Sequence, residues 1–238
     1  MDSYRIIHED ADLLIANKLG PLPVQPDKSG DASLQDLLRA EIAGRAGAAG
    51  AFFLEAAHRI DRRASGAVIF AKTHRALETL EADFRQKRIE KTYMVCVEHE
   101  PEPREGRLEH RLVWDKRTNL VRAFPINASN SEAVSAGGTH GILEYRLAGA
   151  SERYFFVEVT LITGKHHQIR AQLAAEGMPI RGDIKYGARR TNPNGLIMLH
   201  ARRLVLTQPR TREKLDLVAP YPESEPLWAA LDVSPSPP

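Results

Sequence analysis

The chain has 238 residues, of which 42% are hydrophobic, and a formal net charge of +2 at pH 7. This composition is typical of a folded globular protein. No stretch approaches the roughly 18 to 20 apolar residues of a membrane helix, and the first residues are acidic where a secretory signal needs an apolar core. We therefore expect a cytoplasmic protein. The single cysteine, Cys96, cannot form an internal disulfide and lies in an apolar run, which predicts a buried, unreactive thiol.

Alternation of apolar residues and turn formers predicts the elements of the first half. Two short strands flank the acidic turn in YRIIHEDADLLIANKLG, and Ser33 caps a helix that extends to about Ile42. SGAVIFAKT predicts a buried strand. The helix after it places three apolar residues on one face, Leu77, Leu80 and Phe84. EKTYMVCVEHE predicts a further strand.

The second half predicts more strands and one helix. Short strands are expected at RLVW and NLVRAF, and a mobile surface loop over residues 127–141. ILEYRLAG, RYFFVEVTLIT and LIMLHARRLVLT predict strands, and HQIRAQLAAEG a helix closed by Gly177. No repeat or linker divides the chain, so we expect one α+β domain over residues 1–220, with a mixed, mainly antiparallel sheet and flanking helices. Residues 221–238 form a C-terminal extension with a disordered end.

Positive charge is concentrated in three stretches. Residues 58–93 contain nine Lys and Arg against five Asp and Glu, residues 165–190 six against two, and residues 200–214 five against one. Together these stretches are suited to a face that binds phosphates. Solvated charged surfaces explain the same counts, so charge alone does not identify a partner.

HRIDRRASG, residues 58–66, places one carboxylate, Asp61, among three arginines. The strand that follows should be buried, so Asp61 lies on a loop that a rigid scaffold can hold still. Two interpretations remain open on this stretch alone. Asp61 either ties its own loop together or belongs to a functional site.

TGKHHQIR ends a strand and begins a helix, and the basic, glycine-containing loop PIRGDIKYG follows it. Helix starts and backbone amides of this kind bind anions. His166 and His167 are adjacent rather than at i and i+4, and no cysteine accompanies them, so we expect no metal site. Neither a Walker-type phosphate loop nor a GxGxxG motif is present, so no nucleotide cofactor is expected.

Five stretches, in this order, resemble the motifs of the RluA-type family of RNA pseudouridine synthases: HRIDRRASG, EKTYMV, TGKHHQIRAQL, GMPIRGDIKYG and LHARRL. One motif would be weak evidence, whereas five in order at plausible spacing are strong. The resemblance covers the chain from HEDADLLIANKLG to about LVLTQP. It implies the pseudouridine synthase fold, a long mixed sheet with a central cleft, and isomerisation of uridine in ribosomal or transfer RNA without any cofactor.

The resemblance also assigns roles by position. Asp61 is similar to the family's essential aspartate, and Arg59 to the arginine that fills the place of the flipped base. Tyr93 resembles the aromatic residue that packs on the target uracil, and Arg170 the cation that pairs with the aspartate. The further expected contacts are Arg62, Lys165 and His167 with RNA, and Ile169 and Leu199 in the apolar pocket wall.

Some features depart from the family. Ala64 stands where the family usually has threonine, and Leu19 where it has proline, but neither change removes a reacting group. Many relatives carry an RNA-binding domain of the S4 type before the catalytic part, and this chain starts too close to its first motif to hold one. We therefore expect substrate choice to depend on the catalytic domain and its loops, among them residues 128–141. No long heptad pattern is present, which favours a monomer.

Isomerisation breaks the bond between C1′ and N1 of uridine and joins C1′ to C5. A carboxylate can act as a nucleophile at C1′ or C6, or as a base in a glycal route, and the sequence does not select among these. Arg170 beside Asp61 would favour the reactive, ionised form. Flipping the base costs a few kcal/mol, of which stacking on Tyr93 would return about 1 to 3 kcal/mol. Tyr93 is alternatively a core strand residue, and its hydroxyl is also a candidate base for the C5 proton.

Two other classes of function fit part of the pattern. A non-catalytic RNA-binding or RNA-folding chaperone module would keep the basic stretches but would not need Asp61. A glycosidase would need a second acid about 5 to 10 Å from Asp61, and the only candidate, Asp183, is expected to fix its own loop. The presence of Asp61, Tyr93 and Arg170 at their motif positions favours the synthase.

Overall fold

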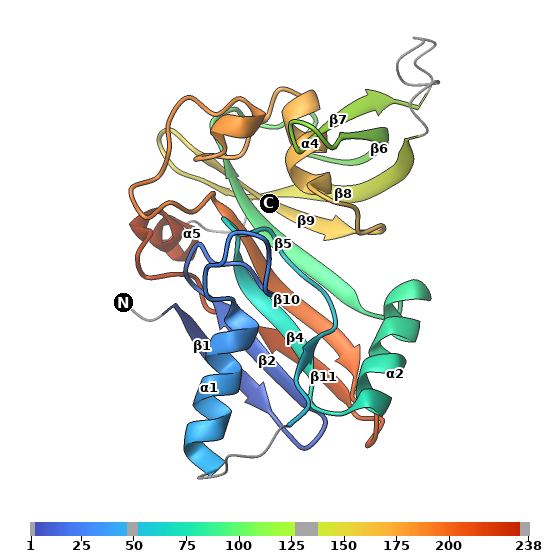
Figure 1. The fold of residues 1–238 in the computed structure, drawn as a ribbon. Helices are drawn as coiled ribbons and strands as arrows, with labels where there is room; N and C mark the ends of the chain where they lie inside the picture. The colour runs from blue at the N-terminus through green and yellow to red at the C-terminus, as the bar shows by residue number, and fades with distance from the viewer. Residues whose placement is uncertain (1–2, 47–51, 127–137, 234–238) are drawn as a thin grey trace. The chain divides into compact units, whose positions relative to one another are not determined.

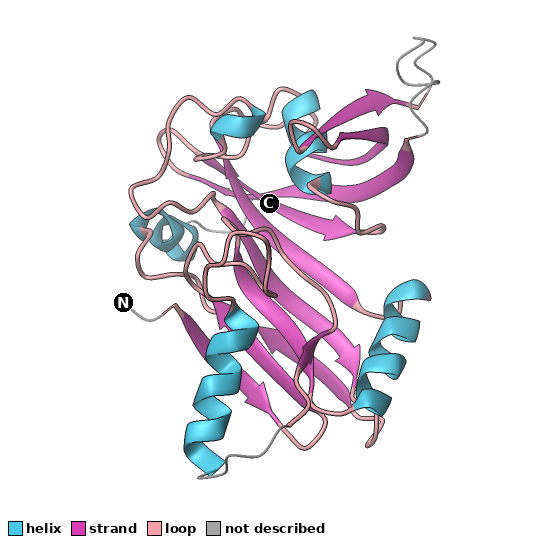
Figure 2. Cartoon of the chain, viewed as in Figure 1, coloured by secondary structure: helices cyan, strands magenta, loops and turns pink. Residues whose placement is uncertain are grey.

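The structure is a computed structural model that describes residues 3–46, 52–126 and 138–233 (Figure 1). The chain divides into two compact units. Unit 1 comprises Met1–Lys91 and His200–Pro222, and unit 2 comprises Thr92–Leu199 and Glu223–Pro238. Each unit contains strands and helices, which confirms the predicted α+β class (Figure 2). Across the described ranges, no helix is long and apolar enough to span a membrane.

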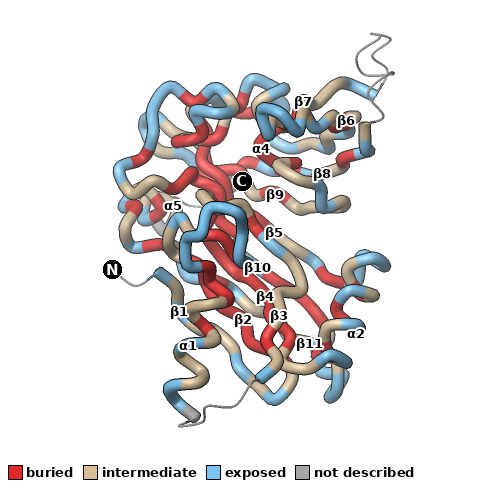
Figure 3. The backbone as a smooth tube through the Cα atoms, viewed as in Figure 1, coloured by how far each residue is buried: buried red, intermediate tan, exposed pale blue. Residues whose placement is uncertain are grey.

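The strands of unit 1 form a mixed sheet in the order β1-β2-β4-β10. The bounds are β1 Tyr4–Glu9, β2 Leu13–Lys18, β3 Glu55–Ala56, β4 Ser65–Ala71, β10 Leu199–Thr207 and β11 Lys214–Val218. The short strand β3 also pairs with β4, and β11 pairs with β10. The β4–β10 pair is parallel and the other pairs are antiparallel. All residues of β2 and β4 are buried, which confirms the buried strand predicted at SGAVIFAKT (Figure 3).

Two helices accompany this sheet. Helix α1, Leu34–Ala46, begins at Ser33, whose hydroxyl accepts a 3.1 Å hydrogen bond from the Asp36 N–H while the Asp36 carboxylate accepts one from the Ser33 N–H. The predicted start is therefore confirmed, and the helix extends four residues beyond the predicted end. Helix α2, His74–Arg85, begins with Thr73 as its N-cap. The three residues predicted on its apolar face, Leu77, Leu80 and Phe84, pack in the core of this unit.

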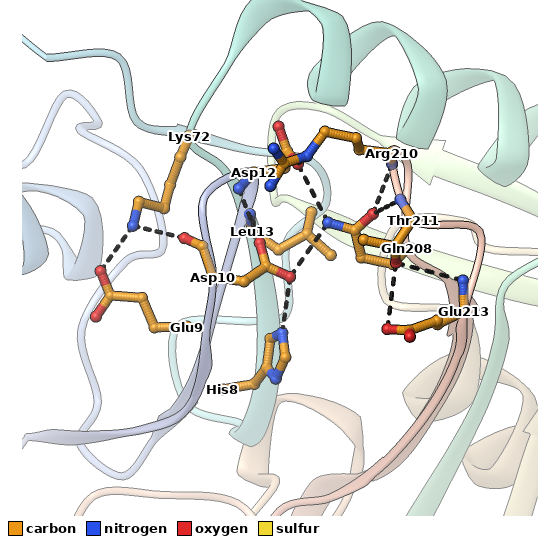
Figure 4. Close-up of polar contacts among 10 residues, drawn as sticks. All are labelled: His8, Glu9, Asp10, Asp12, Leu13, Lys72, Gln208, Arg210, Thr211 and Glu213. Carbon is orange, nitrogen blue, oxygen red and sulfur yellow. Dashed lines mark hydrogen bonds and ion pairs between the residues drawn. The ribbon is translucent and has the colours of Figure 1, made fainter.

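A polar network fixes the β1–β2 turn of unit 1 (Figure 4). One Asp10 carboxylate oxygen accepts from the backbone N–H groups of Asp12 and Leu13, each at 2.8 Å. The Gln208 amide donates to Asp10 and Asp12 at 3.2 Å and so connects this turn to the end of β10. The Lys72 ammonium, just after β4, contacts Glu9 at 2.8 Å. The acidic turn at the end of β1 is thus held to the ends of β4 and β10 by side chains that pair with its carboxylates.

The strands of unit 2 are all antiparallel and follow the order β5-β9-β8-β6-β7. Their bounds are β5 Glu90–Val97, β6 Glu105–Asp115, β7 Leu120–Pro125, β8 Thr139–Ala150 and β9 Phe155–Leu161. Strand β6 is much longer than the predicted RLVW, because EGRLEH before it alternates polar and apolar residues. Of the predicted loop over 127–141, residues 127–137 lie outside the described residues, and 139–141 belong to β8.

Helix α4, Gln168–Ala175, packs on strands of this unit. Its residue Ala171 packs against Leu112 of β6 and Val121 of β7. The predicted stop is confirmed, because Gly177 has a φ of 74° and the next N–H, of Met178, donates to the Leu173 carbonyl at 2.9 Å. Three short helical segments were not predicted: η1 Ile184–Tyr186, η2 Pro226–Trp228 and α5 Ala229–Val233.

Two further expectations concern Cys96 and the C-terminal extension. Cys96 is fully buried in β5, and burial raises the pKa of its thiol, so the predicted unreactive cysteine is confirmed. In the C-terminal extension, Trp228 is buried and lies 6.1 Å from the Phe156 ring, measured between ring centroids. The tail at 234–238, predicted to be disordered, lies outside the described residues.

Candidate active site

The loop that carries Asp61 connects β3 to β4 in unit 1, and its first residue is fixed to the core. The His58 Nε2 accepts a hydrogen bond of 3.1 Å from the backbone N–H of Ile69 in β4. The ring also lies 5.2 Å from that of Phe84, between centroids. Loss of hydration, with a smaller contribution from Lys91, lowers the pKa of His58 to about 3. His58 is therefore neutral at physiological pH, as its acceptor role requires.

The end of the loop is fixed equally firmly. Ser65 and the Nδ1 of His200 lie 2.8 Å apart, and the His200 Nε2 is 3.0 Å from the Ala219 carbonyl. Because a carbonyl only accepts, Nε2 carries the proton, and Nδ1 accepts from the Ser65 hydroxyl. Burial lowers the pKa of His200 to about 4 and keeps the ring neutral. Gly66 has a φ of 113°, and a Cβ there would overlap the backbone of Ala201, so only glycine fits.

A buried cation supports the middle of the loop. The Lys18 ammonium, at the end of β2, donates to the carbonyl of Arg62 at 2.8 Å and to that of Gly20 at 2.9 Å. Burial lowers the pKa of Lys18 to about 7, against an opposing attraction to Asp61 that raises it and a repulsion from Arg62 that lowers it further. Asp61 therefore favours the protonated form of Lys18.

The arginines of HRIDRRASG do not share one role. Arg62 donates to the Ser29 hydroxyl at 3.0 Å and pairs with the Asp31 carboxylate. This hydrogen bond from Arg62 holds the pKa of Asp31 below its usual value. Arg62 therefore connects the Asp61 loop to the loop before α1. Arg59 is exposed. The expected RNA contacts of Arg59 and Arg62 stay predictions.

Arg170 and Asp183 form a buried ion pair in unit 2. The Arg170 Nε donates to one carboxylate oxygen of Asp183 at 2.6 Å, and a terminal nitrogen donates to the other at 2.8 Å. The guanidinium also lies over the Tyr186 ring, 4.8 Å from its centroid. The Asp183 carbonyl accepts from the N–H groups of Tyr186 and Ala188, at 2.9 and 3.1 Å. Asp183 thus orients Arg170 and fixes its own loop, and the expected pairing of Arg170 with Asp61 stays a prediction.

The turn before α4 depends on a buried glutamine. The side-chain oxygen of Gln168 accepts from the Lys165 N–H at 3.0 Å and from the Thr163 hydroxyl at 2.9 Å. His167 adopts a left-handed conformation, with a φ of 50°, and its Nδ1 lies 2.9 Å from the Tyr186 hydroxyl. Lys165 is exposed. This geometry presents a basic turn to solvent, as an RNA contact requires, but contact with RNA stays a prediction for Lys165 and His167.

The remaining expected site residues of unit 2 are buried. Tyr93 lies in β5 opposite Val159 of β9 and is 7% exposed. Ile169 and Leu199 are buried too, each 4% exposed. Burial is compatible with both interpretations of Tyr93, a core aromatic and a pocket residue. The pocket roles of Tyr93, Ile169 and Leu199 therefore stay predictions.

Several supporting residues were not found from the sequence. They are Lys18, His58, Ser65 and His200 around the Asp61 loop, and Gln168 and Tyr186 around Arg170. Asp183 was expected to fix its own loop, but its pairing with Arg170 was not predicted. One signal was available for Lys18, because a lysine directly after the apolar run LLIAN in a core strand predicts a buried charge that needs partners. The His200 contact joins residues 135 positions apart, and no local pattern indicates it.

Comparisons with known proteins identify the family of the chain. The family model described as RNA pseudouridylate synthase matches residues 12–175, which include Asp61, Tyr93 and Arg170. The chain is 33% identical over 229 residues to Ribosomal large subunit pseudouridine synthase C of Vibrio vulnificus, covering 92% of this chain and 66% of the relative. It is 34% identical over 223 residues to the protein of that name in Vibrio cholerae, covering 90% and 65%. The chain thus spans just under two thirds of the length of these relatives.

The fold is similar to the solved structure of Human RNA Pseudouridylate Synthase Domain Containing 4. The TM-score is 0.76 at 24% sequence identity, and the match covers 95% of this chain and 90% of that chain. This likeness confirms the predicted pseudouridine synthase fold. Because the family model covers most of the chain and includes the segment that holds Asp61, the chain belongs to the RNA pseudouridylate synthase family.

Proposed function

We propose that this protein isomerises uridine in RNA to pseudouridine, with Asp61 as the reacting carboxylate. One observation carries the proposal. Within the segment that matches the family, the Asp61 loop is fixed at its start by His58, in its middle by Lys18 and at its end by Ser65. A loop that only connects two strands does not need three side-chain anchors, whereas a reacting carboxylate must be held in one geometry.

The reaction needs no oxidant and no cofactor. The C1′–N1 bond breaks, the uracil rotates, and a bond forms between C1′ and C5. The proton on C5 is then lost and N1 gains one, so the product is an isomer of the substrate. Asp61 acts either as a nucleophile at C1′ or C6 or as a base that removes a sugar proton in a glycal route. All three routes require the ionised carboxylate.

The other residues of the proposed site bind and orient the flipped nucleotide. Tyr93 stacks on the target uracil, which offsets part of the few kcal/mol that base flipping costs. Arg59 is exposed and occupies the space that the flipped base leaves in the RNA. Arg170 pairs with Asp61 in the complex with RNA. Its bidentate contact with Asp183 supports this role, because it fixes the plane of the guanidinium.

The substrate that we propose is ribosomal RNA. Both Vibrio relatives are named for the large ribosomal subunit, which is the reason for placing ribosomal RNA before transfer RNA. Which uridine is modified depends on loops that contact the surrounding RNA.

Release of tritium from transcripts labelled at uridine C5 tests the proposal, because C5 loses its hydrogen only when the new bond forms. Large-subunit ribosomal RNA fragments and transfer RNAs are incubated with the wild type and with Asp61→Asn. We expect release from ribosomal RNA by the wild type and none by the variant. Tight binding without release from any RNA would favour the RNA-binding module instead.

A further inference from the structure

An exposed tryptophan in unit 2 is held in one orientation by its polar edge. Trp114, near the end of β6, is 48% exposed. Its indole N–H donates to the Asn119 side-chain oxygen at 3.1 Å, and the His166 Nε2 lies 2.9 Å from the same oxygen. Because an indole N–H only donates, this Asn119 atom is an acceptor, and His166 must donate through Nε2. Asn119 has a φ of 52°, which asparagine tolerates in a tight turn.

The tryptophan begins a series of four rings that ends at Arg170. Between centroids, the Trp114 and His166 rings lie 4.9 Å apart, and the His166 and His167 rings are stacked at 3.9 Å. The Tyr186 ring follows edge-on at 5.6 Å from His167, and Arg170 lies over Tyr186. The series therefore connects an exposed aromatic face on the β6–β7 turn to a residue of the proposed active site, entirely within unit 2.

Positive charge surrounds the exposed end of the series. The Lys116 ammonium lies over the Trp114 ring, 5.8 Å from its centroid, and Arg117 beside it is exposed. The one acid of this turn, Asp115, is engaged in the turn itself, where it accepts from the Arg117 N–H at 2.9 Å and the Thr118 hydroxyl at 2.8 Å. An aromatic face with flanking cations is complementary to a nucleotide, which carries a flat base and a phosphate.

We propose that Trp114, oriented by Asn119 and backed by the stacked His166 and His167, is the platform on which an unpaired base of the RNA substrate stacks, with Lys116 at a phosphate. This inference rests on the proposed function in that it takes RNA as the substrate. Stacking on an aromatic side chain accepts any base, so the platform contributes affinity and orientation rather than sequence choice. Its preorganisation by Asn119 reduces the entropy lost on binding.

Equilibrium binding of a single-stranded oligouridine RNA tests the platform. We expect Trp114→Ala to weaken binding by about 10-fold, within the range known for one base stacked on an aromatic residue. Trp114→Phe keeps an aromatic face, and its affinity for oligouridine should fall by less than about 3-fold. Lys116→Ala should reduce the slope of log binding constant against log salt concentration by about one, as the loss of one phosphate contact predicts. Arg153→Ala is the control, because it removes an exposed cation from the β8–β9 turn. Its affinity for oligouridine should equal that of the wild type.

Tryptophan fluorescence of the wild type gives a second measurement that needs no variant to fold. The other tryptophan, Trp228, is 3% exposed, so saturating oligouridine should quench emission from Trp114. No quenching, or a loss of less than about 3-fold in affinity for Trp114→Ala, overturns the platform. If that loss is found but the wild type releases no tritium, the platform stands and the proposed function fails. If Trp114→Ala binds oligouridine within about 3-fold of the wild type and both proteins release tritium, the platform fails and the function stands.

Discussion

The Lys18 ammonium donates a 2.8 Å hydrogen bond to the carbonyl of Arg62, the residue that follows Asp61. Lys18 is fully buried, and the contact joins two stretches that are 44 residues apart in the sequence. The same ammonium is electrostatically attracted to Asp61. One buried lysine therefore both shapes the loop and places a positive charge near the proposed reacting group.

Replacement of Lys18 should lower the turnover number strongly while the protein stays folded. Lys18→Met removes the donor for two loop carbonyls and the positive charge near Asp61, but it also removes the cost of burying a charge. We expect kcat to fall at least about 10-fold, corresponding to about 1.4 kcal/mol of lost transition-state stabilisation, with little change in KM. Lys28→Met, at an exposed lysine, is the control. A Lys18→Met protein with the native circular dichroism spectrum and wild-type kcat would rule out this role.

The buried lysine also predicts a pH dependence of stability. Its pKa is lowered from 10.5 to about 7, chiefly by burial. Between these two values the unfolded chain binds more protons at this group than the folded chain does, so its contribution to the free energy of unfolding rises with pH. Urea unfolding of the wild type and Lys18→Met at several pH values isolates this contribution, since the other groups are common to both. The free energy of unfolding of the wild type minus that of Lys18→Met should increase from pH 7 to 10.5. A difference that stays constant with pH would show that the pKa of Lys18 is not lowered in the folded protein.

Gly66 should be irreplaceable at the end of the Asp61 loop. Its φ of 113° and the overlap of a Cβ with the Ala201 backbone predict that Gly66→Ala is strongly destabilising, by roughly 2 kcal/mol or more. Gly44→Ala is the matched control, because Gly44 is an exposed residue of α1 with nothing within 4 Å of a new Cβ. That change should stabilise the helix by up to about 1 kcal/mol. Thermal unfolding of both variants tests the contrast, and equal effects would contradict it.

The Arg170–Asp183 pair should matter far more than a surface pair. The side chains of Arg170 and Asp183 are only 7% and 2% exposed. Asp183→Asn would therefore leave the buried Arg170 guanidinium without the carboxylate that it pairs with. We expect a loss of about 3 to 5 kcal/mol in the free energy of unfolding, together with loss of activity. Asp216→Asn breaks the exposed pair between Arg203 on β10 and Asp216 on β11, and it should change the free energy of unfolding far less. Chemical denaturation distinguishes the two, and similar losses would mean that the buried pair is not a specific support.

Much of the fold follows from local patterns in the sequence. Ser33 as a helix cap, Gly177 as a helix stop and the apolar face with Leu80 are local signals, and the structure contains all three. The failures are also local in origin. Strand β11, KLDLV, has five residues that alternate between exposed and half-buried, too short a run to separate from a loop. Strand β6 was underestimated because its polar residues face solvent.

The candidate site was less predictable than the fold, because its supports are long-range contacts. The motifs identified Asp61 and Arg170, but the anchors of the Asp61 loop come from β2 and β10, far away in the sequence. The partner of Arg170 that the structure shows is Asp183, which the sequence indicated only as a loop residue. Such pairings depend on how strands and loops meet in three dimensions, and no periodicity encodes them.

Pseudouridine formation by Asp61→Asn tests the central claim most directly. The wild type, Asp61→Asn and the control Asp216→Asn are incubated with ribosomal RNA fragments, and the digested nucleosides are separated by chromatography. We predict pseudouridine from the wild type and from Asp216→Asn, and none from Asp61→Asn, although all three proteins bind the RNA. Pseudouridine from Asp61→Asn at the wild-type rate, or none from the wild type on any ribosomal or transfer RNA, would contradict the role of Asp61 as the reacting carboxylate of an RNA pseudouridine synthase.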